Sequence, residues 1–286
     1  MHVNINGTIT PEDEAFISIF DHGFLFGDSV YEAFRTYQRK IFLFSRHYDR
    51  LEFSARGVHM SLPWPKDRVR SEMVRTLEIA NHPAESRVRL IVTRGIGDMV
   101  ADPETCADPA VIIIVAPLSD PPREMYTDGV EMIVSTVPRG GMVAAYKTGN
   151  LMHQVLATRE AKSKKAYDAI LLTTDGYISD GIACNVHMVQ GTTIKTPGRQ
   201  AAIVEGITKA AVLDVAGRLG LDVIEGLFRP DEIHRSTEMF LTSSAREVVP
   251  IVRVDGKPIG NGRPGPWTLK ILDAYRGAIG HLLQEN

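Results

Sequence analysis

A proline-rich segment near the middle of the chain most constrains how this sequence can fold. Residues 116–123 carry three prolines and directly follow the continuous apolar run of residues 111–115, which is typical of a buried strand. Proline cannot continue the interior of a strand or helix, so a linker is expected here. The sequence therefore predicts a smaller N-terminal domain at residues 1–118, a linker at 119–126 and a larger C-terminal domain at 127–286.

Both predicted domains mix helices and strands. Val212, Val215, Ala216 and Leu219, for example, share one face of a helix because their spacing follows the helical repeat. The pattern predicts a mixed α/β (α+β) chain. The expected strands are 3–5, 30–37, 88–93, 111–115, 130–137, 169–173, 186–189, 223–228 and 239–242, and the expected helices are 47–58, 66–79, 150–165, 208–219 and 267–283.

Composition narrows the class of protein. The 286 residues carry a net charge of −3, so a broad basic surface for nucleic acid is not expected. The apolar run at 110–117 is too short to cross a membrane, and residues 1–4 lack the pattern of a secretion signal. Cys106 and Cys184 are far apart, which disfavours a disulfide framework or a metal site and favours the cytoplasm.

Seven short motifs follow one another in a fixed order. Together they resemble the class IV aminotransferases, the fold type IV enzymes that use pyridoxal 5'-phosphate (PLP), over nearly the whole chain. The resemblance implies a two-domain fold like that of D-amino-acid aminotransferase, and a homodimer. The motifs lie at residues 20–32, 47–51, 93–95, 147–151, 176–181, 206–208 and 254–260.

Lys147 matches the lysine that binds the cofactor as a Schiff base in this family. Taken alone it resembles any solvated surface lysine, which describes most lysines in proteins. It lies, however, between the apolar residues 143–145 and a turn of small residues before an expected helix. A desolvated lysine can lose its proton, as this chemistry requires.

The resemblance also implies a set of groups that bind the cofactor. Arg50, by spacing alone a surface helix arginine, would hold the phosphate through its planar fork. The turn at 206–208 opens a helix whose free N–H groups would face an anion, although Thr208 also suits a helix N-cap. Ser244 and Glu247 fit a capping box as well. The expected cofactor-binding residues are Arg50, Lys147, Asp180, Val204, Gly206, Ile207, Thr208, Ser243 and Ser244.

Asp180 is a departure from the family pattern. The family usually has glutamate at this position, where it contacts the pyridine nitrogen. Aspartate is one methylene shorter, so it would stop roughly 1.3–1.5 Å short of that nitrogen, about one C–C bond. Asp180–Gly181 also fits an ordinary turn, so a structural role is the competing interpretation.

Three residues are candidates for substrate binding. By resemblance, Tyr31 lines the active site and Arg89 contacts substrate carboxylates in branched-chain aminotransferases. Arg87 stands where that group usually has tyrosine, and it shares a strand face with Arg89. A solvated charged strand face would explain the two arginines equally well. The loop at 96–103 lacks the arginine and histidine of the D-amino-acid transaminases.

The sequence thus predicts an aminotransferase with a ping-pong mechanism, in which Lys147 acts as general base and acid. Branched-chain L-amino acids are the expected donors and a 2-oxo acid such as 2-oxoglutarate the expected acceptor. The alternatives are a D-amino-acid transaminase, a 4-amino-4-deoxychorismate lyase that releases pyruvate, and a catalytically idle relative. No nucleic acid, membrane or metal ion is expected to bind.

Overall fold

The computed structural model describes residues 1–285 and divides the chain into two compact units. The first comprises Met1–Ser119, Tyr146–Asn150 and the residues from His281 onward, and the second comprises Asp120–Ala145 and Leu151–Gly280. The first break falls within the segment expected to be a linker. The chain re-enters the first unit twice, at Tyr146–Asn150 and from His281 onward. A single division at the linker would place both of these segments in the second unit. Tyr146–Asn150 belongs to the first unit because its backbone pairs with the start of a strand there: the N–H of Tyr31 donates to the carbonyl of Lys147 at 2.9 Å.

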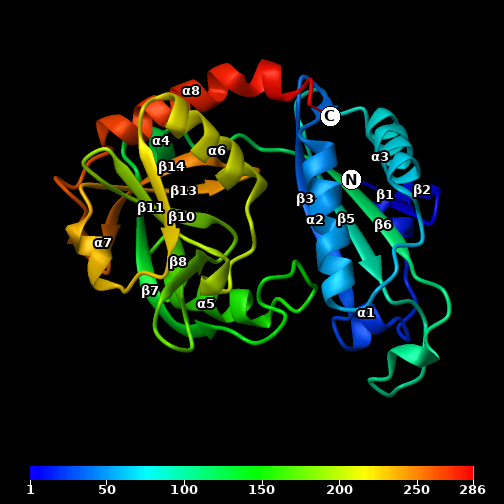
Figure 1. Ribbon diagram of the computed structural model, residues 1–286. Helices are drawn as coiled ribbons and strands as arrows, with labels where there is room; N and C mark the ends of the chain where they lie inside the picture. The colour runs from blue at the N-terminus through cyan, green and yellow to red at the C-terminus, as the bar shows by residue number, and fades with distance from the viewer. Residues whose placement is uncertain (286) are drawn as a thin grey trace. The chain divides into compact units, whose positions relative to one another are not determined.

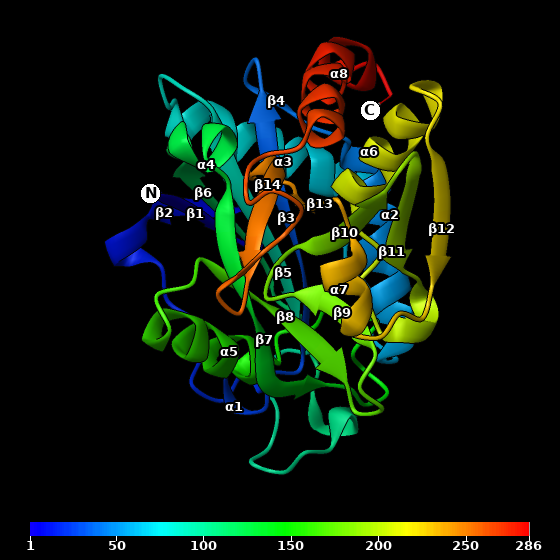
Figure 2. The ribbon, with the colours of Figure 1, turned by 90° about the vertical axis from the view of Figure 1, so that its left-hand side faces the viewer.

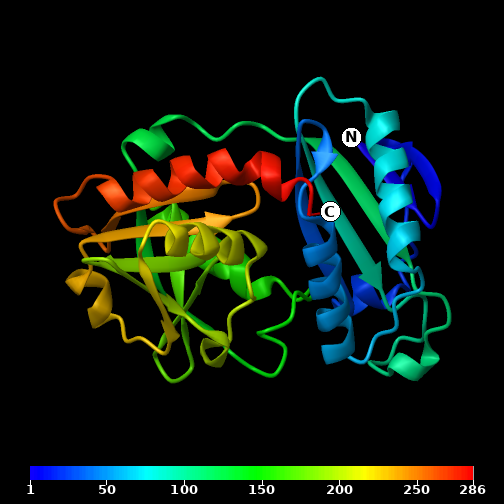
Figure 3. The ribbon, with the colours of Figure 1, turned by 45° about the horizontal axis from the view of Figure 1, so that its top comes forward.

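The first unit contains a six-stranded sheet in the order β2-β1-β6-β5-β3-β4, in which every neighbouring pair is antiparallel. Helix α2 lies beside β3, and α3 lies beside β1 and β6 (Figure 3). The bounds are β1 His2–Ile5, β2 Thr8–Pro11, α1 His22–Leu25, β3 Ser29–Tyr37, β4 Lys40–Ile41, α2 Phe44–Gly57, α3 Lys66–Ala80, β5 Ser86–Thr93 and β6 Val111–Pro117, with 3-10 turns at Glu12–Glu14 and Pro103–Thr105.

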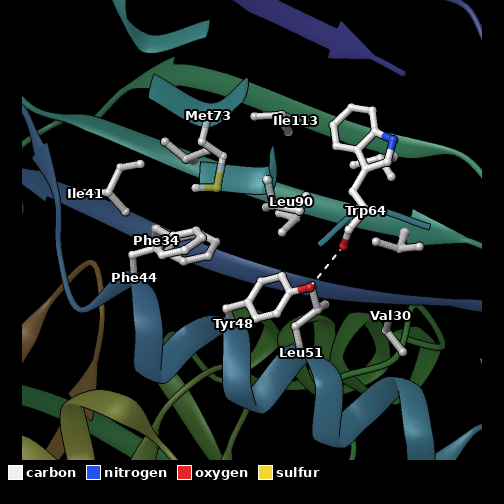
Figure 4. Packing of buried hydrophobic residues seen from close by; sticks show 14 of the residues in the cluster. Val30, Phe34, Ile41, Phe44, Tyr48, Leu51, Trp64, Met73, Leu90 and Ile113 are labelled. Atoms are coloured by element: carbon white, nitrogen blue, oxygen red, sulfur yellow. Dashed lines mark hydrogen bonds between the residues drawn. The ribbon is translucent and has the colours of Figure 1, made fainter. Parts of the chain in front are cut away.

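The core of the first unit forms between α2, α3 and one face of the sheet. Along β5, buried Val88, Leu90 and Val92 alternate with the more exposed Arg87 and Arg89, as expected for a strand with one face in the core. Figure 4 shows the apolar cluster, which extends from Ile41 and Phe44 at one end to Val30 at the other and includes a hydrogen bond from Tyr48 Oη to the carbonyl of Trp64.

The second unit contains a nine-stranded mixed sheet in the order β12-β11-β10-β13-β14-β7-β8-β9, with β15 paired to β14. Pairs β11–β12, β14–β7 and β7–β8 are parallel. This arrangement confirms the predicted mixed α/β class. The strands are β7 Val130–Arg139, β8 Asp168–Thr173, β9 Ile178–Gly181, β10 Asn185–Gln190, β11 Thr193–Pro197, β12 Asp222–Gly226, β13 Glu238–Ser243, β14 Glu247–Val254 and β15 Lys257–Pro258.

Helices cover parts of this sheet. Figure 1 shows α6 near β12 and β13, and Figure 2 shows α5 along β7 and β8. The helices are α4 Glu124–Thr127, α5 Met152–Ser163, α6 Ile207–Arg218, α7 Asp231–Arg235 and α8 Pro266–Leu282, with a 3-10 turn at Arg199–Ala201. No helix among residues 1–285 is long and apolar enough to cross a membrane.

Two local expectations about helix starts were wrong. Ser244 and Glu247 do not form a capping box, because β13 and β14 form a hairpin in which Ser243 lies opposite Glu247. The run of β-branched residues after Glu247 favours a strand over a helix. Helix α6 has Gly206 at its N-cap, which places Thr208 one residue inside the first turn rather than at the cap.

Candidate active site

The backbone of Lys147 lies beside the first residues of strand β3. Its N–H donates to Ser54 Oγ of α2 at 3.1 Å, and the N–H of Gly149 donates to the carbonyl of Ser29 at 2.8 Å. The Nζ atom of Lys147 lies 3.4 Å from Tyr31 Oη and 4.4 Å from the centre of the Tyr31 ring. Lys147 is therefore held by its backbone, and its amine lies against a buried phenol.

The same tyrosine contacts a second cation. The guanidinium of Arg89 lies 4.1 Å from the centre of the Tyr31 ring. Of the residues predicted for catalysis and substrate binding, the structure therefore brings Lys147, Tyr31 and Arg89 together. Arg87 is exposed and lies opposite Arg35 of β3. Along β5 it is two residues further from Tyr31 than Arg89 is.

A buried carboxylate, Glu32, follows Tyr31 on β3 and has two partners on α2, an arginine and a histidine. Its side chain is completely buried. Arg50 donates to it through Nε and Nη2, both at 2.7 Å, and His47 Nδ1 lies 2.7 Å from Oε2. Burial alone would raise the pKa of Glu32, but Arg50 and His47 outweigh that effect and hold the pKa well below its usual value.

These contacts change the interpretation of Arg50. Its side chain is only 12% exposed, so it is not a solvated surface arginine. It forms a bidentate ion pair with Glu32 instead. Sequence reasoning missed Glu32 and His47 as site residues. The available signal was the three-residue spacing of His47 and Arg50, which places both on one face of α2.

In the second unit, Asp180 of β9 is buried and accepts two hydrogen bonds. Asn185 Nδ2 donates to it at 2.7 Å and the N–H of Val204 at 3.0 Å, while Arg139 Nη2 lies 3.8 Å away. Burial raises the pKa of Asp180, and Arg139, the Val204 N–H and Asn185 offset only part of that rise. The Asp180–Gly181 pair lies at the end of strand β9 rather than in a turn.

Asn185 and Arg139 are the residues that place Asp180, and sequence reasoning missed both. Asn185 Nδ2 also donates to the carbonyl of Val204 at 3.0 Å, which joins Asp180 to the loop before α6. Arg139 is itself fixed, because it donates to the carbonyls of Ala202 and Ala144, each at 2.9 Å. The sequence offered no direct signal for either residue.

The loop before α6 fits closely around this network. A Cβ atom at Gly206 would lie 1.9 Å from Asn185 Oδ1, so a larger residue there would displace the Asn185 side chain. The helix begins at Ile207, and the first N–H groups of any α-helix have no partner within the helix. The turn at Gly206 therefore presents N–H donors at the positive end of a helix of 12 residues, next to a buried Thr208.

Ser243 ends β13 and is held by Arg246. Arg246 Nε donates to Ser243 Oγ at 3.1 Å, and its Nη1 donates to Asp168 Oδ2 at 2.9 Å. With an arginine donating to its oxygen, the Ser243 hydroxyl retains its own proton to donate. Ser244 follows in the turn of the hairpin.

Known proteins are similar to this chain over most of its length. The family model described as amino-transferase class IV matches residues 29–254. The chain belongs to the class IV aminotransferases. It is 32% identical to a putative branched-chain-amino-acid aminotransferase of Methanocaldococcus jannaschii, with 96% of each chain covered. It is 30% identical to a D-alanine aminotransferase of Bacillus licheniformis, with 98% of this chain and 97% of the relative covered.

A solved structure also resembles this class IV aminotransferase over nearly its full length. The branched-chain amino acid aminotransferase of Escherichia coli has a TM-score of 0.92 and 26% identity, and the match covers 97% of this chain and 94% of that chain. Another solved branched-chain amino acid aminotransferase, with a TM-score of 0.92 and 25% identity over 100% of this chain and 95% of that chain, holds pyridoxamine 5'-phosphate. The family match and these relatives support an enzyme of the PLP-dependent transaminase type.

Each unit of this class IV enzyme contains groups of the kinds that would suit PLP. Lys147 supplies an amine, and the N-terminus of α6 supplies backbone donors for a phosphate. Asp180 supplies a buried carboxylate for a protonated ring nitrogen. Each of the two units, taken by itself, contains groups of the kind that the cofactor needs.

Proposed function

We propose that this protein is a PLP-dependent aminotransferase that moves the amino group of a branched-chain L-amino acid to a 2-oxo acid such as 2-oxoglutarate, by a ping-pong mechanism. One observation carries the proposal: the amine of Lys147 and the guanidinium of Arg89 both contact the ring of Tyr31. A nucleophilic amine and a carboxylate-binding fork close to one aromatic ring suit an amino acid substrate.

Two sets of residues would hold the cofactor. Arg50, the turn at Gly206, Ile207 and Thr208, and the hydroxyls of Ser243 and Ser244 would bind the phosphate. Val204 would pack under the ring, and Asp180 would face the ring nitrogen. When bound, PLP withdraws electrons from the Cα atom of the amino acid and so stabilises negative charge there. The proposed cofactor-binding set is Arg50, Lys147, Asp180, Val204, Gly206, Ile207, Thr208, Ser243 and Ser244.

Lys147 would carry the proton. Its amine removes the proton from the substrate Cα as general base and returns a proton as general acid. Tyr31 Oη, 3.4 Å from that amine, keeps it oriented, and Ser54 keeps its backbone in place. Arg89 would bind the substrate carboxylate. Arg87, which is exposed and pairs with Arg35 at a greater distance along the strand from Tyr31, stays a weaker candidate for the same role.

We further propose that the enzyme is a cytoplasmic homodimer, with a smaller N-terminal domain at residues 1–118, a linker at 119–126 and a larger cofactor-binding domain at 127–286. The family resemblance supports the dimer, and the two widely separated cysteines support a reducing compartment. Analytical ultracentrifugation of the PLP-loaded protein would measure the subunit number directly.

The function is tested by half-reactions. The PLP-loaded protein is mixed separately with L-leucine, L-valine, L-isoleucine, D-alanine and 4-amino-4-deoxychorismate, and the cofactor absorption is followed. We expect the branched-chain L-amino acids to bleach the cofactor band fastest and 2-oxoglutarate to restore it. Faster bleaching by D-alanine would make this a D-amino-acid transaminase. Release of pyruvate without accumulated pyridoxamine phosphate would make it a lyase. If no amine changes the band, the transaminase proposal is wrong.

Two matched pairs of variants test the residues. Borohydride should fix PLP to Lys147 in the wild type and in the exposed-lysine control Lys164→Ala, but not in Lys147→Ala. Fixation at another lysine would overturn the assignment. Arg89→Met should raise KM for both the amino acid and the oxo acid roughly tenfold or more, which corresponds to about 1.4 kcal/mol. Arg87→Met, the control from the same strand face, should change KM little. Equal effects would mean that both arginines act together.

A further inference from the structure

A cavity lies within the first unit, away from Lys147. Its volume is about 540 Å³, and it opens among the β3–β4 turn, the start of α2, helix α3 and the C-terminal residues Leu283 and Gln284. Thr36 of β3 lines it, while Lys147 pairs with the other end of that strand at Tyr31. Five residues of strand separate the two positions by ~17 Å. The cavity is therefore distinct from the candidate catalytic lysine.

The floor of this cavity is apolar. Ile41 and Phe44 line it from β4 and α2, and both side chains are buried. Val74 and Leu77, three residues apart on α3, also line it. Figure 4 shows Ile41 and Phe44 at one end of the apolar cluster of this unit. Volumes of roughly 300–1,000 Å³ are typical of small-molecule sites, in which an apolar surface is combined with a few polar groups.

The rim of the cavity is cationic. Arg39, Lys40 and Arg70 line it against a single carboxylate, Glu78. Among residues 1–285, no carboxylate pairs with Lys40 or Arg70, and the partner of Arg39 is the amide oxygen of Asn81 at 2.8 Å. Three permanent cations beside one acid give this opening an excess of positive charge.

Glu85, an acid outside the lining, bonds to the chain near the cavity but not to the side chains of these three cations. The Glu85 carboxylate accepts from Thr36 Oγ1 at 2.5 Å and from the N–H groups of Gln38 and Arg39 at 2.7 and 3.2 Å. It is committed to the β3–β4 turn. The guanidinium and ammonium groups on the rim therefore remain available to an anion from solution.

We propose that this cavity binds a small organic anion with an apolar body. Arg39, Lys40 and Arg70 hold the anionic group, and the body packs on Phe44, Val74 and Leu77. The apolar floor excludes an inorganic ion as the best ligand, because such an ion would leave that floor exposed to water. The excess of cations disfavours amines.

The position of the cavity gives its occupant a route to the candidate active site. Phe44 is the first residue of α2, and later turns of the same helix carry Arg50 and Ser54, which contact Glu32 and Lys147. The C-terminal wall is also tied to this helix, because Arg46 pairs with Glu285 at 2.5 Å. A ligand that restrains the first turn of α2 therefore acts on the helix that positions Lys147.

The test uses 4-phenylbutyrate as the probe, titrated into the full-length PLP-loaded protein with labelled Ile, Leu and Val methyl groups. We expect saturable shifts at the methyls of Ile41, Val74 and Leu77. The uncharged analogue 4-phenyl-1-butanol, the cationic 4-phenylbutylamine and inorganic phosphate should each bind at least tenfold more weakly. Equal affinity for the alcohol or the amine would overturn the proposal, as would shifts that leave these three methyls unchanged.

Variants localise the binding. Arg70→Glu and Lys40→Glu should each weaken binding of 4-phenylbutyrate about tenfold or more. Arg68→Glu makes the same charge change on α3, at a residue that stacks on Trp64 instead of lining the cavity, and should leave the affinity within twofold. Val74→Trp, which fills the cavity without changing charge, should abolish binding while the circular dichroism spectrum is retained. Unchanged binding in Val74→Trp, or equal losses in Arg68→Glu and Arg70→Glu, would refute the site.

Discussion

Two buried carboxylates, one in each unit, lie in opposite electrostatic settings. Glu32 in the first unit receives three short contacts from Arg50 and His47, which hold its pKa well below the usual value. Asp180 in the second unit has two uncharged donors and one arginine at 3.8 Å, and burial raises its pKa. The first is a satisfied ion pair, and the second is a charge that its surroundings only partly compensate.

This difference separates a structural role from a chemical one. A carboxylate whose charge is fully matched holds a helix to a sheet, as Glu32 holds α2 to β3. A buried carboxylate with spare capacity for a cation has favourable interactions still to make. Asp180 is such a group, and a protonated ring nitrogen would be a suitable partner.

The largest expected effect comes from removing the charge of Glu32. Glu32→Gln leaves Arg50 and His47 without their carboxylate in a buried setting, and breaking such a pair costs about 3–5 kcal/mol. We expect the free energy of unfolding, measured by urea denaturation, to fall by that amount, together with weaker PLP binding because Arg50 loses its anchor. If Glu32→Gln lowered the unfolding free energy by less than about 1 kcal/mol, Glu32 would contribute no more to stability than Asp180 is expected to.

The pH dependence of stability sharpens the same contrast. Because the folded pKa of Glu32 is lowered, its contribution is present above the unfolded pKa of about 4.3 and is lost as pH falls through the folded pKa. The wild type should therefore lose stability between about pH 4.3 and 2 more steeply than Glu32→Gln. Urea midpoints measured at several pH values check this, and parallel curves for the two proteins would contradict it.

Asp168 provides a paired carboxylate in the same unit as Asp180. It accepts from Arg246 at 2.9 Å and from the N–H groups of Ala169 and Ile182 at 2.8 and 3.0 Å. Asp168→Asn weakens the ion pair and turns an NH₂ group toward one of these donors, so we expect a loss of about 2–3 kcal/mol in unfolding free energy. A negligible loss would mean that pairing does not distinguish the carboxylates of the second unit.

Sequence patterns predicted the elements with strong periodicity. Helix α6, expected at 208–219, spans Ile207–Arg218, and β6, expected at 111–115, spans Val111–Pro117. Strand β14 was missed because Ser244 and Glu247 imitate a helix cap. Local spacing reports which face of an element is apolar, but it does not report which neighbour that face meets.

The same limit applies to the candidate site. Motif order selected Lys147, Arg50, Asp180 and Gly206 one at a time. Of the partners that place them, Glu32 ends the motif at residues 20–32 and Asn185 lies in none of the motifs, and neither position reveals which residue its side chain contacts. The Tyr146–Asn150 segment is the clearest case: its return to the first unit depends on backbone pairing with β3, which no short motif encodes.

The smallest effect on stability is expected at Asp180. Because its folded pKa is raised, its favourable contribution is present below the unfolded pKa of about 3.9 and is lost as pH rises through the folded pKa. At neutral pH the ionised form of Asp180 therefore lowers the stability of the folded protein. We expect Asp180→Asn to change the unfolding free energy of the PLP-free protein by no more than about 1 kcal/mol.

Activity should respond to Asp180 in the opposite way. If Asp180 faces the ring nitrogen, Asp180→Asn removes the negative charge that keeps that nitrogen protonated, and the half-reaction with L-leucine should slow by at least tenfold while the fold persists. Asp180→Glu keeps the charge and serves as the control, with a smaller loss of rate. A variant Asp180→Asn that unfolds as readily as Glu32→Gln, yet reacts normally when folded, would show that both buried carboxylates are structural and that their different surroundings have no chemical meaning.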